Sequence, residues 1–240
     1  AGIYDEAVKI LKEEDIEIFE LSGIAPNPKI ESVREGVKLC KENDIDMVLA
    51  IGGGSVIDCA KVVAAGACYD GLSATGSEMD PFAVISDMSK NEKWGTSSEH
   101  MKPKMSILDP EYTYSVSKKQ TAAGTADMIS HICENYFTNV KNADVQARFA
   151  EGLLKNCFKY GPVALEEPDN YDARANLMWT ASMAINGILS DGAEVSWCVH
   201  PMEHELSAFY DITHGEGLAI LTPHWMDFAL NDDTASKFAD

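Results

Sequence analysis

Residues 49–58 read LAIGGGSVID, an apolar run followed by three glycines and the first residues of a helical pattern. The apolar run starts near residue 46, and a continuous run of this kind is typical of a buried parallel strand. Helical spacing of apolar residues follows over 56–67. Because strand, glycine turn and helix occur in this order, the stretch predicts a βαβ unit.

The alternation of helix and strand continues on both sides of this stretch. Upstream, apolar spacing predicts helices over 4–14 and 30–43, with a strand over 16–21 between them. Downstream, strands are expected over 82–86 and 104–108. The first part of the chain therefore predicts an α/β domain built on a parallel sheet.

The pattern changes near residue 117. From there the apolar spacing is helical and strand-like alternation is absent. The expected helices cover residues 121–136, 143–160, 171–189, 201–210 and 215–230. We therefore expect two domains, an α/β domain over 1–117 and an all-helical domain over 118–240.

The α/β domain is expected to be incomplete. The chain starts inside a predicted helix with no strand before it, and residues 67–77 leave no room for the strand that a βαβ crossover should reach. We expect a disordered or deleted segment near 70–72.

The overall charge disfavours two classes of partner. The 240 residues carry 19 basic and 39 acidic side chains, a net charge of -20 that repels nucleic acid and anionic membrane surfaces. The six cysteines are scattered without a C-x-x-C pair, which argues against a disulfide framework and favours a reducing, cytoplasmic setting. No apolar run reaches membrane-spanning length.

Two loops have the composition of a phosphate-binding site. Glycines after a strand let a pyrophosphate approach the backbone, and the helix that follows offers free N–H groups. The loop departs from the G-x-G-x-x-G pattern because Ile57 stands in place of the last glycine. A second loop, SATGSE at 73–78, adds hydroxyls and amides. Each loop taken alone also fits an ordinary turn.

The helical part carries a set of candidate metal ligands. Asp127 and His131 are four residues apart, which places both on one helix face. His200 and His204 have the same spacing, and His214 precedes a glycine at another expected helix start. One carboxylate and three neutral imidazoles would leave a divalent ion one net positive charge and Lewis acidity. The alternative is that these histidines are only packed in a helical bundle. His100, in a polar loop, and His224, after Pro223 in a helix, are expected to be structural.

The motifs taken together resemble the iron-containing (group III) alcohol dehydrogenases. The matching stretches are GGGSVIDCAK, ATGSE, ILDPE, GTADMISHICE and HPMEHELSAFYDITHGEG. The resemblance implies a dehydroquinate synthase-like fold, with a dinucleotide-binding α/β domain, a helical metal domain and a site in the cleft between them. It also implies further helices after residue 240, so the helical domain is expected to be truncated.

The resemblance also implies roles for individual residues. The metal ligands would be Asp127, His131, His200 and His214, while His204 would relay a proton or contact the substrate. Residues lining the cofactor would be Gly53, Gly54, Ser55 and Asp58 at the pyrophosphate, Thr75 at a phosphate or the ribose, and Lys93 at the ribose.

The activity implied is hydride transfer between NAD or NADP and a primary alcohol or aldehyde such as butanol or butyraldehyde. The stretches GIAPNP and HPMEHELSAFYDITHGEG resemble the butanol dehydrogenase branch, and the metal would be Fe²⁺ or, alternatively, Zn²⁺. A homodimer is expected. The usual Thr-Ala-Gly ahead of Thr75 reads Leu72-Ser73-Ala74, which leaves NAD and NADP open. The alternatives are a zinc polyol (glycerol-type) dehydrogenase, a dehydroquinate synthase-like lyase, and an inert metal- and nucleotide-binding fragment.

Overall fold

The computed structural model describes residues 2–68, 78–98, 101–138, 140–193, 195, 197–232 and 234–239. These residues form two compact units. We call the described residues of 1–77, 81–88 and 94–103 the N-terminal unit, and those of 78–80, 89–93 and 104–240 the helical unit. The domain boundary expected at residue 117 stays a prediction.

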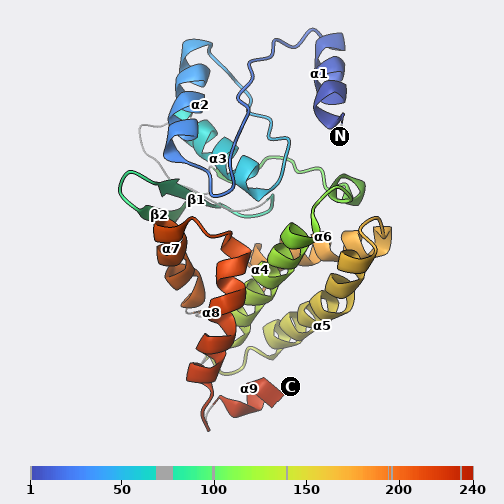
Figure 1. The fold of residues 1–240 in the computed structure, drawn as a ribbon, viewed down its shortest axis with the longest axis vertical. Helices are drawn as coiled ribbons and strands as arrows, with labels where there is room; N and C mark the ends of the chain where they lie inside the picture. The colour runs from blue at the N-terminus through green and yellow to red at the C-terminus, as the bar shows by residue number, and fades with distance from the viewer. Residues whose placement is uncertain are drawn as a thin grey trace. The chain divides into compact units, whose positions relative to one another are not determined.

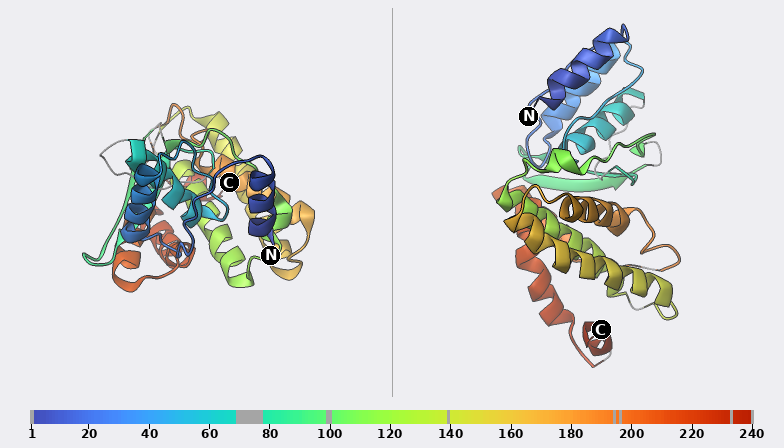
Figure 2. Two further views of the ribbon diagram at one scale, coloured as in Figure 1. Left: turned by 90° about the horizontal axis from the view of Figure 1, so that it is seen from above. Right: turned by 90° about the vertical axis from the view of Figure 1, so that its right-hand side faces the viewer.

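The N-terminal unit contains three helices and a strand pair. Its elements are α1 (Ile3–Glu13), α2 (Ile30–Glu42), α3 (Gly54–Cys68), β1 (Phe82–Asp87) and β2 (Glu92–Ser97), the last of which begins in the helical unit. Helix α2 lies alongside α3, as Figure 1 shows, and the blue and cyan helices stay together in both views of Figure 2. Ile30, Val33 and Val62 form the core between them with Ile85 of β1. The three helices confirm the predictions for 4–14, 30–43 and 56–67.

The expected parallel sheet is not found within the described part of the unit. No strand forms at residues 16–21, 46–51 or 104–108. One isolated parallel bridge joins Lys29 to Ser86. The prediction of a buried strand at 46–51 was wrong, since Met47 is 61% exposed. Apolar composition suits a strand, but a strand forms only where a neighbouring strand pairs with its N–H and C=O groups. Among the described residues, no strand pairs with 46–51.

The expected gap near 70–72 and residues 73–77 of the second loop, including Thr75, lie outside the described residues. Glu78 is the one residue of that loop that is described.

The helical unit is built from long helices packed side by side. They are α4 (Lys118–Tyr136), α5 (Asp144–Glu166), α6 (Tyr171–Ile185), α7 (Val199–Tyr210), α8 (His214–Ala229) and the short α9 (Ala235–Ala239), preceded by a 3-10 turn at Pro110–Thr113. Helix α4 packs against both α5 and α8, while α5 packs against α6 and α7 against α8 (Figure 1). The structure thus confirms the five predicted helices. Helix α8 packs against both α4 and α7.

Side-chain caps begin two of these helices. The Ser117 hydroxyl accepts a hydrogen bond from the Gln120 amide at the start of α4, and Asn170 accepts one from Ala173 at the start of α6. Such caps satisfy amides that have no partner within the helix. Helix α7 has no cap from its own N-cap residue, Cys198.

The cysteines and the helix lengths bear on two expectations drawn from composition. The cysteines described there, Cys40, Cys59, Cys133, Cys157 and Cys198, are free thiols. No described helix combines the length and the apolar character needed to cross a bilayer.

Candidate metal centre

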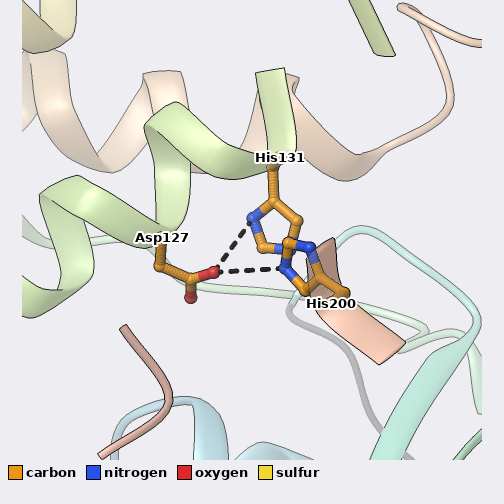
Figure 3. Close-up of side chains that lie close together, drawn as sticks. All are labelled: Asp127, His131 and His200. Atoms are coloured by element: carbon orange, nitrogen blue, oxygen red, sulfur yellow. Dashed lines mark ion pairs between the residues drawn. The ribbon is translucent and has the colours of Figure 1, made fainter. Parts of the chain in front are cut away.

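Three helices of the helical unit contribute to one cluster of ring nitrogens and carboxylate oxygen. Asp127 and His131 project from the same face of α4, because residues four apart are neighbours on a helix. His200 comes from the first turn of α7, and His214 is the first residue of α8. Figure 3 shows Asp127, His131 and His200 pointing toward one another. The helix start expected at Pro201 lies two residues earlier, at Val199.

Asp127 Oδ1 is the common point of this cluster. It lies 3.5 Å from His131 Nδ1, 3.5 Å from His200 Nε2 and 3.8 Å from His214 Nε2. Ligand atoms about 2.1 Å from a tetrahedral ion are about 3.4 Å apart, so these separations are close to those of a coordination shell. The structure therefore brings together the four residues that the sequence predicts as ligands.

Two buried atoms in the cluster lack a hydrogen-bond partner. They are Asp127 Oδ1 and His200 Nε2, and they face each other. A buried polar atom without a partner is costly, so such atoms are commonly explained by an ion or a ligand. With the His200 proton on Nδ1, two lone pairs would face one another here, and a cation between them removes the conflict. A carboxylate and three imidazoles are also ligands that Fe²⁺ and Zn²⁺ accept.

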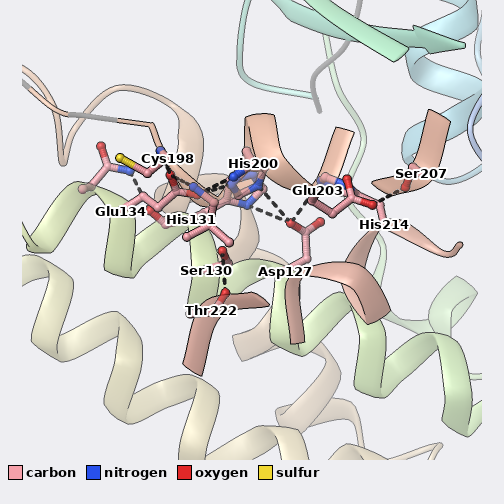
Figure 4. A network of polar contacts seen from close by, with 12 residues as sticks. Asp127, Ser130, His131, Glu134, Cys198, His200, Glu203, Ser207, His214 and Thr222 are labelled. Atoms are coloured by element: carbon pink, nitrogen blue, oxygen red, sulfur yellow. Dashed lines mark hydrogen bonds and ion pairs between the residues drawn. The ribbon is translucent and has the colours of Figure 1, made fainter. Parts of the chain in front are cut away.

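Glu134 lies directly behind His200. Its carboxylate accepts hydrogen bonds from the backbone amides of Cys198 (2.5 Å), Val199 (3.0 Å) and His200 (3.1 Å), and it also contacts the His200 Nδ1 atom. Glu134 thus supplies from α4 the cap that α7 lacks. Figure 4 shows the Glu134 side chain between the start of α7 and the imidazole.

Glu203 has the same relation to His214. Its side chain is fully buried, and its carboxylate contacts His214 Nδ1 and accepts a hydrogen bond from the Ser207 hydroxyl (Figure 4). The Lys93 ammonium donates to Glu203 at 3.1 Å and lies 3.3 Å from His214 Nδ1. Lys93, predicted to contact a ribose, is therefore buried in an ion pair of the helical unit, and its contact with ribose stays a prediction.

The histidines of the cluster differ in their pKa values. Burial disfavours the imidazolium form of His200, but the contact with Glu134 and the negative charges of Asp127 and Glu134 outweigh it and raise the His200 pKa to about 9. For His131, burial outweighs Asp127 and lowers the pKa to about 4. Burial alone would raise the pKa of Asp127, yet the three imidazoles hold it well below its usual value. The carboxylate is therefore an anion in its pocket.

His204 lies beside the four predicted ligands. Its ring centroid is 5.6 Å from that of His214, and burial together with the nearby Lys93 ammonium lowers the His204 pKa to about 3. Glu203, His204 and His214 also form a group with metal-ligand spacing. Because the Glu203 carboxylate is already engaged by Lys93 and Ser207, the Asp127 group suits a cation better.

Sequence patterns did not single out Glu134, Glu203 or Trp197. The Trp197 ring meets His200 edge-on at 5.2 Å and His131 at 5.9 Å, so it covers one side of the cluster with apolar surface. A signal for the two carboxylates was present, since each glutamate follows a predicted ligand by three residues and so shares its helix face.

The predicted cofactor residues lie in the N-terminal unit, apart from Lys93. Gly53 and Gly54 are exposed where α3 begins, and the Gly53 carbonyl accepts from the Val56 and Ile57 amides in the first turn. Ser55 is half-buried and Asp58 is buried. The glycine turn therefore leads into a helix as predicted, and the cofactor contacts of these residues stay predictions.

Comparison with known families identifies both parts of the chain. The profile of the family "Iron-containing alcohol dehydrogenase" matches residues 1–110, and that of "Fe-containing alcohol dehydrogenase family, C-terminal" matches residues 121–240. Among similar proteins are NADH-dependent butanol dehydrogenase A of Clostridium acetobutylicum, 56% identical over 99% of this chain, and an NADPH-dependent aldehyde reductase of Escherichia coli, 38% identical over 92%.

A solved structure has the same fold. The crystal structure of NADH-dependent butanol dehydrogenase A from Thermotoga maritima aligns with a TM-score of 0.90 and 42% identity over 95% of this chain. The chain spans 67% of the Clostridium protein, 64% of the Escherichia protein and 63% of the Thermotoga structure. The Clostridium alignment runs over 260 positions, more than the 240 residues of this chain, so that relative has internal residues that this chain lacks.

Proposed function

Because the chain belongs to the iron-containing alcohol dehydrogenase family, we propose that it transfers hydride between NAD(P) and a primary alcohol or aldehyde at a divalent metal. The observation that carries the proposal is the convergence of three histidine nitrogens on the buried Oδ1 of Asp127. The activities named for its relatives, butanol dehydrogenase and aldehyde reductase, favour this substrate class over the lyase and the polyol alternatives.

Within the proposed site, each residue of the chain has a distinct task. Asp127, His131, His200 and His214 would hold the ion, which when bound polarises the oxygen of the substrate as a Lewis acid. His204, whose ring lies beside that of His214, would pass on the proton that leaves or joins this oxygen. Trp197 keeps water from one side of the cluster.

The nicotinamide cofactor would be held by the glycine turn. Gly53 and Gly54 expose backbone at the start of α3, with Ser55 and Asp58 in its first turns, which is an arrangement suited to a pyrophosphate. The cofactor supplies the hydride, and the protein orients it. NADH- and NADPH-dependent relatives both occur, so the nucleotide preference is decided by experiment. Fe²⁺ as the metal, a homodimer and a cytoplasmic location belong to the same proposal.

The test combines metal analysis with a cofactor assay. The purified chain is expected to retain Fe²⁺ or Zn²⁺ and to oxidise NADH or NADPH in the presence of butyraldehyde. The His214→Ala variant should lose the metal and the turnover while still binding dinucleotide, because the glycine turn is unchanged. Full activity of the metal-free chain would refute the proposal, whereas a preference for glycerol over butanol would favour the polyol alternative.

A further inference from the structure

Each of two predicted ligands on α7 and α8 has a buried glutamate behind its ring. Glu134 is 2% exposed and contacts Nδ1 of His200, while Glu203 is 0% exposed and contacts Nδ1 of His214. In both rings the opposite nitrogen, Nε2, is the atom that faces Asp127. The two imidazoles therefore lie between a carboxylate on one side and the candidate metal position on the other.

The surroundings of both glutamates require an anion. Glu134 accepts hydrogen bonds from three backbone amides at the start of α7 and also contacts Nδ1 of His200. Three N–H donors on one carboxyl group favour its anionic form. The carboxylate of Glu203 forms an ion pair with the buried ammonium of Lys93 and neutralises its charge. Charge-assisted hydrogen bonds of this kind are short and directional, and a carboxylate can accept them on both oxygens.

We propose that Glu134 and Glu203 are positioning residues that keep the imidazole proton of His200 and His214 on Nδ1, so that each Nε2 stays available as a metal ligand. This inference rests on the proposed metal site. Only a nitrogen without a proton can coordinate, and a carboxylate on Nδ1 fixes both the tautomer and the ring orientation. Lys93 holds Glu203 in place through the ion pair, and its ammonium also lies 3.3 Å from His214 Nδ1.

Replacement of Glu134 by glutamine separates this role from simple packing. The amide has nearly the same shape, but its NH₂ group donates where Glu134 accepts. If the NH₂ group faces the amides of Cys198 and Val199, the start of α7 loses its cap. If it faces Nδ1 of His200, the ring proton is forced onto Nε2. Either arrangement weakens metal binding at His200.

The experiment measures the Zn²⁺ affinity of the chain by competition with a chromophoric chelator. Glu134→Gln and Glu203→Gln are each expected to raise the Kd about 10- to 100-fold, and Glu134→Asp to recover part of the loss. The matched control is Glu151→Gln on α5, since Glu151 is also a buried carboxylate but accepts from Tyr136 and Arg148. This control should leave the Kd unchanged.

A double-mutant comparison shows whether Glu134 acts through His200. In a His200→Ala background, Glu134→Gln should cause no further loss of affinity, because the ring that it orients is absent. The tautomer is read directly from imidazole ¹⁵N shifts of the Zn²⁺-loaded chain, which should show the proton on Nδ1 of His200 and His214. This second measurement uses the unaltered chain and does not depend on the folding of any variant.

The outcomes distinguish a failure of the proposed metal site from a failure of the proposed positioning role of Glu134 and Glu203. If the unaltered chain takes up no Zn²⁺, the proposed metal site fails and the inference fails with it. If the chain binds Zn²⁺ and both glutamine variants bind it as tightly as the Glu151→Gln control, the inference alone is overturned. A proton found on Nε2 of either histidine would overturn it equally.

Discussion

At the scale of single residues, His200 and His204 show how neighbours on one helix acquire different roles. The Nε2 of His200 faces Asp127 and its Nδ1 faces Glu134, so both ring nitrogens are committed. His204 lies one turn further along α7 and meets His214 at a ring distance of 5.6 Å. We therefore expect different consequences when each is removed.

His204→Ala should leave metal binding intact and slow turnover. The four predicted ligands are unchanged, while loss of a positioned proton-transfer group lowers kcat by about 10²-fold or more. Metal content and steady-state kinetics with butyraldehyde check this expectation. His224→Ala is the control, because His224 is exposed on α8. If the His204 variant turns over as fast as the control at every pH, His204 has no part in proton transfer.

The buried thiol of Cys157 should make the helical unit less stable at alkaline pH. Burial raises the pKa of this thiol from 9.0 to about 11, so the folded chain favours the neutral form. The resulting stabilisation is complete below pH 9 and is lost as the pH rises through about 11. Cys157→Ala should therefore reduce the fall in unfolding free energy between pH 8 and pH 10 by about 1 kcal/mol.

Urea unfolding under reducing conditions at the two pH values measures this difference. Cys198→Ala serves as the control, because that thiol is only half-buried. Identical pH slopes for Cys157→Ala and the unaltered chain would contradict the assignment.

Sequence spacing identified the ligands, and it places Glu134 and Glu203 three residues after a predicted ligand without showing that they are buried. Asp127 with His131 was found because a helix brings residues four apart onto one face, which is a local rule. Glu134 and Glu203 are two of many glutamates in an acidic chain, and most of these lie in water. What distinguishes them is burial against another helix, and burial depends on tertiary packing that periodicity does not contain.

At the scale of elements, the sequence predicted the helices more accurately than the strands. A helix satisfies its own backbone hydrogen bonds, so the spacing of apolar residues was enough to predict α2 and α4. A strand depends on a neighbour that is distant in sequence. Residues 46–51 have the composition of a buried strand, yet Leu49 is 55% exposed and no strand is assigned there.

The approach of α8 to α4 depends on a glycine next to a predicted ligand. A Cβ atom at Gly215 would lie 2.0 Å from the backbone oxygen of Ala123, a contact that only a shift of the helix can relieve. Gly215→Ala should destabilise the chain by about 1–3 kcal/mol, as overpacking does. Because the shift also moves His214, Zn²⁺ affinity should fall with stability.

Gly124→Ala provides the matched control for this change. Gly124 lies on α4 next to Ala123, but it is exposed and nothing would lie within 4 Å of a Cβ atom there. Alanine is the better helix former by about 1 kcal/mol, so this variant should be at least as stable as the unaltered chain. Urea unfolding of both variants decides the matter, and equal stability would refute the close approach at Gly215.

At the scale of the whole chain, the predicted ligands are confined to one of two compact units. Asp127, His131, His200 and His214 all belong to the helical unit, while the glycine turn belongs to the N-terminal unit. A bound ion therefore adds cross-links between α4, α7 and α8 only. It also neutralises part of the negative charge in a chain whose net charge is -20.

Binding of Zn²⁺ should consequently stabilise the helical unit alone. At a free concentration of 100 times Kd, a ligand that binds only the folded state adds about 2.7 kcal/mol. Tryptophan fluorescence can follow this unit separately, because Trp179, Trp197 and Trp225 lie in it and Trp94 lies in the N-terminal unit. In a Trp94→Phe background, Zn²⁺ should raise the urea midpoint, a chelator should reverse the change, and His214→Ala should abolish it. An equal shift in the His214→Ala variant would mean that the ion binds elsewhere, because that variant removes the only ligand that α8 contributes among the four predicted residues.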